Sequence, residues 1–180
     1  MLGYTYVQER KVLEIKMKNL DKLQEQTFDK LFYNCLGLTH FAIAFSQPDR
    51  IKTLDISEND IGSTNFMILL PIFKSNNTIE TLNVADTTID GECAKELCGI
   101  LKSQNFALRI LKFRNSNLGE VGAEAISNLI AGHQTLVELE IFNCGIGEQG
   151  GNAIGNALKT NFCIEKLCIG DNILAQADCE

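Results

Sequence analysis

The chain has 180 residues, of which 45% are hydrophobic, and its formal net charge is −7. This acidity argues against a nucleic-acid-binding surface, which needs a basic face. No apolar run approaches the roughly 18 residues that cross a bilayer, and the first residues lack the basic segment and apolar core of a secretory leader. We therefore expect a single-domain, cytoplasmic protein with no nucleic-acid or membrane partner.

The first 50 residues do not keep a clean repeat. Leu13 and Ile15 fall in a repeat-like frame, but the next leucine of that column is Leu54, 41 residues later by subtraction. Residues 27–36 have the apolar spacing of an amphipathic helix. Because the end units of solenoids are commonly atypical, we predict that residues 1–50 form an N-terminal capping region with an irregular repeat.

From residue 51 onward, one frame returns at a nearly fixed interval. It is clearest at residues 136–146, which read Leu-x-x-Leu-x-Ile-x-x-Cys-x-Ile. Its fourth position is always leucine, with steps of 28, 29, 28 and 28 residues by subtraction: Leu54, Leu82, Leu111, Leu139 and Leu167. An internal period of this length predicts a solenoid, with a short strand at each leucine.

Each strand is followed by a turn and, in the first four units, by a glycine and a helix. The helices carry apolar residues at spacings of 0, 1, 4 and 5, which form one buried stripe. Pro71 lies in the middle of the first helix, so we expect that helix to start late or to bend. The position that follows each helix is suited to a left-handed C-cap, and we expect such caps there. The residues at this position are Asn76, Asn105, His133 and Asn161.

The ninth position of the frame carries small residues that can form hydrogen bonds. Their side chains can bond the backbone groups that the bend after each strand leaves free, which would give a ladder along the solenoid. These residues are Asn59, Thr87, Ser116, Cys144 and Asn172.

The pattern resembles the leucine-rich repeats, and the helical unit is similar to the ribonuclease-inhibitor type. Residues 119–126, Gly-Glu-Val-Gly-Ala-Glu-Ala-Ile, match that type best. The resemblance implies an α/β solenoid with a curved parallel sheet on the concave side and helices on the convex side. Residues 51–180 would be five repeats, the last without its helix. Proteins with this fold include inhibitors, immune receptors, small-GTPase activators, tropomodulin-like actin-capping proteins and axonemal scaffolds, so the resemblance leaves the function open.

The resemblance also places strand positions 3, 5, 7 and 8 on the concave face. There Arg114 would lie beside Phe142 and Lys112 beside Glu140, with Ile110 next to them. Exposed arginine and phenylalanine are typical anchors of protein interfaces. The alternative is that Arg114 only covers Phe142 in a cation–π contact.

Acidic residues at the rim of this face could steer a basic partner, although plain solubility would explain them equally well. The candidate partner-binding residues are Ile110, Lys112, Arg114, Glu138, Glu140, Phe142, Asp55 and Asp86. A second partner surface is expected at the open C-terminal edge, where Leu167 and Ile169 would lack a covering helix.

Catalytic motifs are missing from the sequence: there is no nucleophile elbow, no phosphate loop and no histidine pair at metal spacing. His40 lies in an apolar run that favours a packed histidine. We therefore expect no enzyme, no cofactor and no metal. The sequence favours a noncatalytic protein interaction scaffold within a larger assembly, for which the resemblance makes a cytoskeletal or axonemal setting plausible. The alternative is a regulator of an enzyme, such as a small-GTPase activator or a direct inhibitor.

Overall fold

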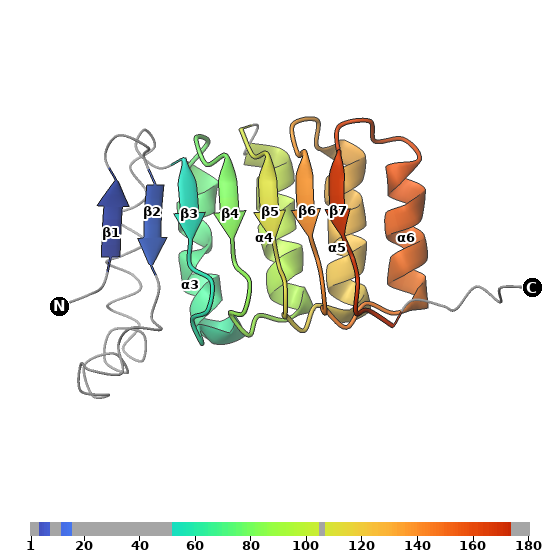
Figure 1. Cartoon of the computed structure of the whole chain (residues 1–180), viewed down its shortest axis with the longest axis horizontal. Helices are drawn as coiled ribbons and strands as arrows, with labels where there is room; N and C mark the ends of the chain where they lie inside the picture. The colour runs from blue at the N-terminus through green and yellow to red at the C-terminus, as the bar shows by residue number, and fades with distance from the viewer. Residues whose placement is uncertain (1–3, 8–11, 16–51, 105–106, 174–180) are drawn as a thin grey trace, which may run out of the picture.

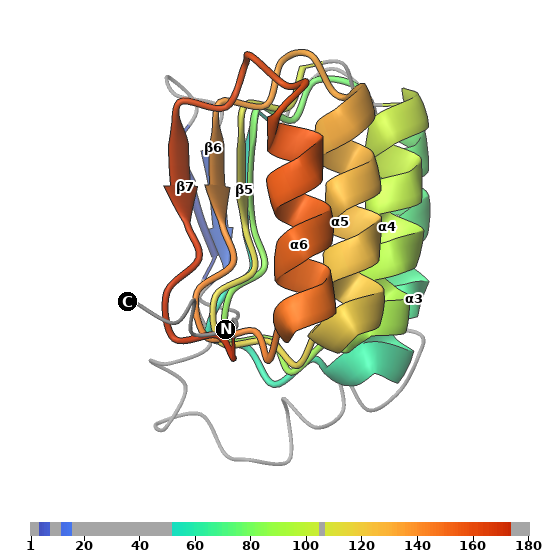
Figure 2. The same cartoon turned by 90° about the vertical axis from the view of Figure 1, so that its right-hand side faces the viewer.

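The computed structural model describes residues 4–7, 12–15, 52–104 and 107–173. Within these residues, a seven-stranded sheet forms one layer and a row of helices covers one of its faces (Figures 1 and 2). The strands lie in chain order from β1 to β7, so each unit packs beside the one before it, as expected for a solenoid.

The strands are short and the helices span three to four turns. The strands are β1 (Tyr4–Val7), β2 (Val12–Ile15), β3 (Thr53–Asp55), β4 (Thr81–Asn83), β5 (Ile110–Lys112), β6 (Glu138–Glu140) and β7 (Lys166–Cys168). The described helices are α3 (Gly62–Ser75), α4 (Gly91–Gln104), α5 (Gly119–Gly132) and α6 (Glu148–Leu158).

The five predicted strands are confirmed, since β3 to β7 are parallel and centre on the five leucines of the frame. One further strand joins this parallel set: β2 pairs with β3 so that Leu13 lies opposite Leu54, despite the longer sequence separation. The sheet is not parallel throughout, because β1 runs antiparallel to β2. The predicted helix at residues 27–36, His40 and the absence of a last helix after residue 173 lie outside the described residues.

The core lies between the sheet and the helices. The central leucines of β3 to β6 are at most 1% exposed, while the residues on either side of them are half-buried, because side chains alternate along a strand. The predicted helical stripe is buried, as Leu69, Leu97, Ile126 and Ile154 show. Burial of each such side chain contributes roughly 1.5–3 kcal/mol to folding. The one polar member of the stripe, Glu96, is exposed.

Pro71 neither delays nor ends its helix, since α3 begins at Gly62 and continues to Ser75. The expected late start is therefore wrong. The proline side chain is exposed, so its ring occupies the outer surface of the helix without entering the core.

The expected left-handed C-caps are also wrong. His133 caps α5 in an extended conformation with φ of −96°, and neither Asn76 nor Asn161 is among the residues with positive φ. The Asn76 side-chain oxygen instead accepts hydrogen bonds from the N–H groups of Thr78 and Ile79, which leads the chain into the next strand. Asn105 lies outside the described residues.

Positive φ angles occur instead at the eighth position of every repeat, where the chain turns away from the sheet. The values there lie between 51° and 60°, at Glu58, Asp86, Asn115, Asn143 and Asp171. Asparagine and aspartate tolerate this region better than most residues do, which explains four of the five side chains.

The predicted ladder at the ninth position forms through four of its five side chains. Asn59 and Thr87 each donate to a backbone carbonyl oxygen of their own bend, whereas Cys144 donates to Phe113 O of the preceding unit and to Phe142 O of its own. Asn172 bonds the neighbouring unit as well: its oxygen accepts from Cys144 N at 2.9 Å and its nitrogen donates to Ile141 O at 2.8 Å. The buried Ser116 hydroxyl has no hydrogen-bond partner in the described structure.

Candidate functional site

The open face of the sheet, defined here as the face turned away from the helices, carries strand positions 3, 5, 7 and 8. Its register is the predicted one, because Ile110 pairs with Glu138 and Lys112 pairs with Glu140 between β5 and β6. Glu138 in turn pairs with Lys166 of β7. Six of the eight candidate residues therefore come from two neighbouring strands and the turns that follow them.

The charged residues of β5, β6 and β7 form one ion-pair network. Lys112 Nζ lies 3.5 Å from Glu138 Oε1 and 3.4 Å from Glu140 Oε2, and Lys166 Nζ lies 2.9 Å from the same Glu138 oxygen. The hydrogen bond from Lys166, with the charge of Lys112 nearby, lowers the pKa of Glu138. Both lysines are therefore matched by carboxylates, and Glu138 is shared between them.

Arg114 and Phe142 are in contact in the next row of the open face. The guanidinium carbon lies 5.4 Å from the centre of the phenyl ring, within the range of a cation–π contact. The ring also lies over Gly170, where an added Cβ would be 3.2 Å from two ring carbons. Because glycine has no side chain, Gly170 leaves room for the phenyl ring. The arginine is exposed and the ring is half-buried.

A row of amides runs beside this pair at the eighth position. Asn143 donates to the Asn115 side-chain oxygen at 2.9 Å, and Asn115 donates to Asp86 Oδ1 at 2.8 Å. The sequence pattern placed these asparagines on the face without predicting their bonds. Their fixed spacing of one repeat is the signal by which the row could have been found.

Asp55 lies apart from the central cluster, because its strand, β3, is separated from β5 by β4. Its carboxylate accepts hydrogen bonds from the Ser57 N–H at 3.0 Å, from the Ser57 hydroxyl at 2.6 Å and from Asn83 at 3.2 Å. Asp86 likewise accepts a bond from Asn115. Both predicted rim carboxylates thus hold local structure on the face as well as adding negative charge to it.

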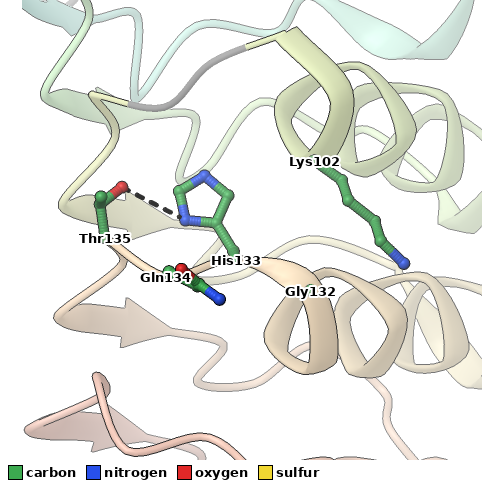
Figure 3. Close-up of a pocket in the computed structure, with 5 residues that line it drawn as sticks. All are labelled: Lys102, Gly132, His133, Gln134 and Thr135. Carbon is green, nitrogen blue, oxygen red and sulfur yellow. Dashed lines mark hydrogen bonds between the residues drawn. The ribbon is translucent and has the colours of Figure 1, made fainter.

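A small crevice lies outside this cluster, at the end of α5 (Figure 3). It has a volume of about 170 Å³ and is lined by Lys102, Gly132, His133, Gln134 and Thr135. The His133 ring is buried and turned toward the Thr135 hydroxyl, 3.5 Å away, whereas Lys102 runs beside the last turn of α5. These contacts fit a helix end and not a reaction centre.

No group of three His, Cys, Asp or Glu side chains in the described residues could hold a metal ion. The described helices also include none that is long and apolar enough to span a membrane.

A family model described as Leucine Rich repeat matches residues 75–98 and 132–155. The chain therefore contains leucine-rich repeats. Its alternation of parallel strands and helices in units of 28 to 29 residues also fits the ribonuclease-inhibitor-like subtype that the sequence pattern predicted.

Two solved structures share this leucine-rich repeat fold. One is the actin-binding site 2 of leiomodin-1, with 19% identity, a TM-score of 0.56, and coverage of 79% of this chain and 78% of that chain. The other is the C-terminal domain of tropomodulin from Caenorhabditis elegans, with 19% identity, a TM-score of 0.61, and coverage of 76% and 82%. Identity at this level establishes the fold alone. None of the curated proteins compared with the chain matches it.

Proposed function

We propose that this leucine-rich repeat protein is a noncatalytic scaffold that binds another protein through the open face of its sheet. The observation that carries the proposal is the exposed Arg114–Phe142 pair near the middle of that face. Arginine and aromatic side chains dominate the binding energy of many interfaces, and paired charges around them serve as the polar rim. The lysines and glutamates of β5 to β7 would supply that rim.

A cytoskeletal assembly is the setting that we propose for this scaffold. The support comes from the two similar structures, of which one is described as an actin-binding site and the other is a tropomodulin domain. A cytoplasmic, cytoskeleton-associated location would follow from that setting. The acidic side chains of the rim, Asp55 and Asp86 among them, would speed the approach of a basic partner surface.

We further propose a second contact surface at the β7 side of the array. Among the described residues, β7 pairs with β6 alone, and Leu167 and Ile169 are only half-buried. Two large apolar side chains near this edge are strongly exposed, Phe162 at 92% and Ile173 at 79%. At the other end of the array, residues 1–50 would act as the cap, with β2 covering the edge of β3.

The proposal is tested by capturing partners from cells with the full chain and repeating the capture with Arg114→Ala combined with Phe142→Ala. The double variant should weaken binding by about 2 kcal/mol or more, which is about thirtyfold in Kd, because both anchors are removed. Its thermal midpoint should stay close to that of the wild type, since neither side chain is buried in the core.

Arg109→Ala is the matched control, because Arg109 is also exposed and forms no ion pair among the described residues, but it precedes β5 and does not occupy frame position 3, 5, 7 or 8. Unchanged capture by the Arg114/Phe142 double variant would refute the proposed binding face. Capture of a small GTPase or another enzyme, with a change in its activity, would favour the regulator alternative over a scaffold.

A further inference from the structure

The cations of the open face differ in whether they already have a partner. Lys112 is bonded by two glutamates and Lys166 by one of them. Arg114 forms no ion pair with any described residue, although it is exposed on the same face. It is thus the one unmatched cation among the charged side chains at the middle of that face.

The contact of Arg114 with Phe142 also places the guanidinium beside an apolar ring. A guanidinium stays charged at every physiological pH and has five N–H donors in one plane. A cation–π contact with a ring uses none of the N–H groups as a conventional hydrogen-bond donor, so they remain available for a bidentate acceptor. Asn143 donates to Asn115 and Asn115 donates to Asp86, and neither side chain forms a hydrogen bond with Arg114 among the described residues.

Phe142 adds an apolar surface next to this donor edge. Its ring is half-buried and lies over Gly170, so no side chain of the following repeat covers it at that position. An apolar group of a partner can therefore rest beside the ring while an acceptor meets the guanidinium.

Resting on the proposed function, we infer that the open face binds a polypeptide segment that presents an aspartate or glutamate carboxylate to Arg114 and an apolar side chain to Phe142. Charge complementarity carries the inference: a carboxylate completes the set of ion pairs, whereas a lysine would meet an unmatched cation. A dianionic phosphate fits less well, because Asp86, Glu138 and Glu140 surround the site and the whole chain carries a net charge of −7.

The test uses the full chain and the capped peptide acetyl-Leu-Gly-Asp-Gly-amide. In an extended segment, leucine and aspartate two positions apart point to the same side, so both can reach the face. Peptides with asparagine, lysine or phosphoserine in place of the aspartate serve as comparisons. Binding is followed by NMR of the arginine side-chain N–H groups, since the sequence contains only Arg10, Arg50, Arg109 and Arg114.

The aspartate peptide should shift the Arg114 signal and bind about tenfold more tightly than the asparagine peptide, because its bond to arginine is charge-assisted. Arg114→Gln should abolish this preference, and Arg109→Gln should leave it unchanged. Any of three results would overturn the inference. The aspartate and asparagine peptides could bind equally well, the lysine or phosphoserine peptide could bind more tightly, or the Arg114 signal could stay unshifted up to about 10 mM peptide. If partner capture still depends on Arg114 and Phe142 in that case, the proposed function holds and only the carboxylate as ligand of Arg114 is rejected.

Discussion

Replacing Gly91 with alanine places a methyl group where α4 meets α5. An added Cβ would lie 2.3 Å from the Leu118 carbonyl oxygen and 3.0 Å from the Gly122 nitrogen. Both are backbone atoms, so no side-chain rotation relieves the clash and the two helices must move apart. Overpacking of this kind costs about 1–3 kcal/mol.

Gly99→Ala is the matched control, because it makes the same substitution in the same helix. Gly99 is exposed, and an added Cβ would meet no atom within 4 Å. Alanine there should stabilise the protein by about 0.5–1 kcal/mol, since it lowers the backbone entropy that folding must remove.

The two variants should therefore differ by about 1.5–4 kcal/mol in the free energy of unfolding. For a chain of this size, each kcal/mol corresponds to a Tm change of about 2–4 °C, so the midpoints should be separated by at least about 3 °C. Thermal melts followed by circular dichroism, together with urea unfolding, measure the difference. A Gly91→Ala variant as stable as Gly99→Ala would refute the close packing of α4 on α5.

Three further predictions follow from side-chain bonds. Asn161→Ala should destabilise the protein by about 1–3 kcal/mol, because the Asn161 side chain forms hydrogen bonds with four backbone groups that then lose their partner. Urea unfolding measures the loss, and a value below about 0.5 kcal/mol would contradict the prediction. The pKa of Glu138 lies below its usual 4.5 because a lysine hydrogen bond stabilises the carboxylate. Its contribution to stability is thus complete above about pH 4.5 and is lost as the pH falls through the folded pKa. Glu138→Gln should therefore flatten the decline of stability below about pH 4.5, and an unchanged slope would argue against the network. Burial raises the pKa of Cys98 to about 12 and that of Cys144 to about 11, so a thiol reagent at about pH 8 should modify the half-buried Cys163 before either of them. Mass spectrometry can follow the modification, and equal rates for all three would contradict the burial.

The sequence by itself determined the repeat, the five parallel strands and the buried helical stripe. It could do so because the period fixes which residues stack on one another: once Leu111 and Leu139 share a column, Lys112 must lie beside Glu140. Alternation along the strand then decides which side chains face the core and which face outward. The candidate face was therefore predictable from the spacing together with the resemblance to leucine-rich repeats.

Only the tertiary structure decided how the side chains of that face are paired. A column gives the neighbour but not the rotamer, so it could not show that Glu138 serves two lysines or that Phe142 lies over Gly170 beneath Arg114. The same limit explains the incorrect helix caps. Asn76 either adopts a left-handed backbone conformation or accepts hydrogen bonds from the residues that lead to the next strand, depending on how far that strand begins from the end of the helix. The separation between helix end and strand start is set by the packing of whole units against one another.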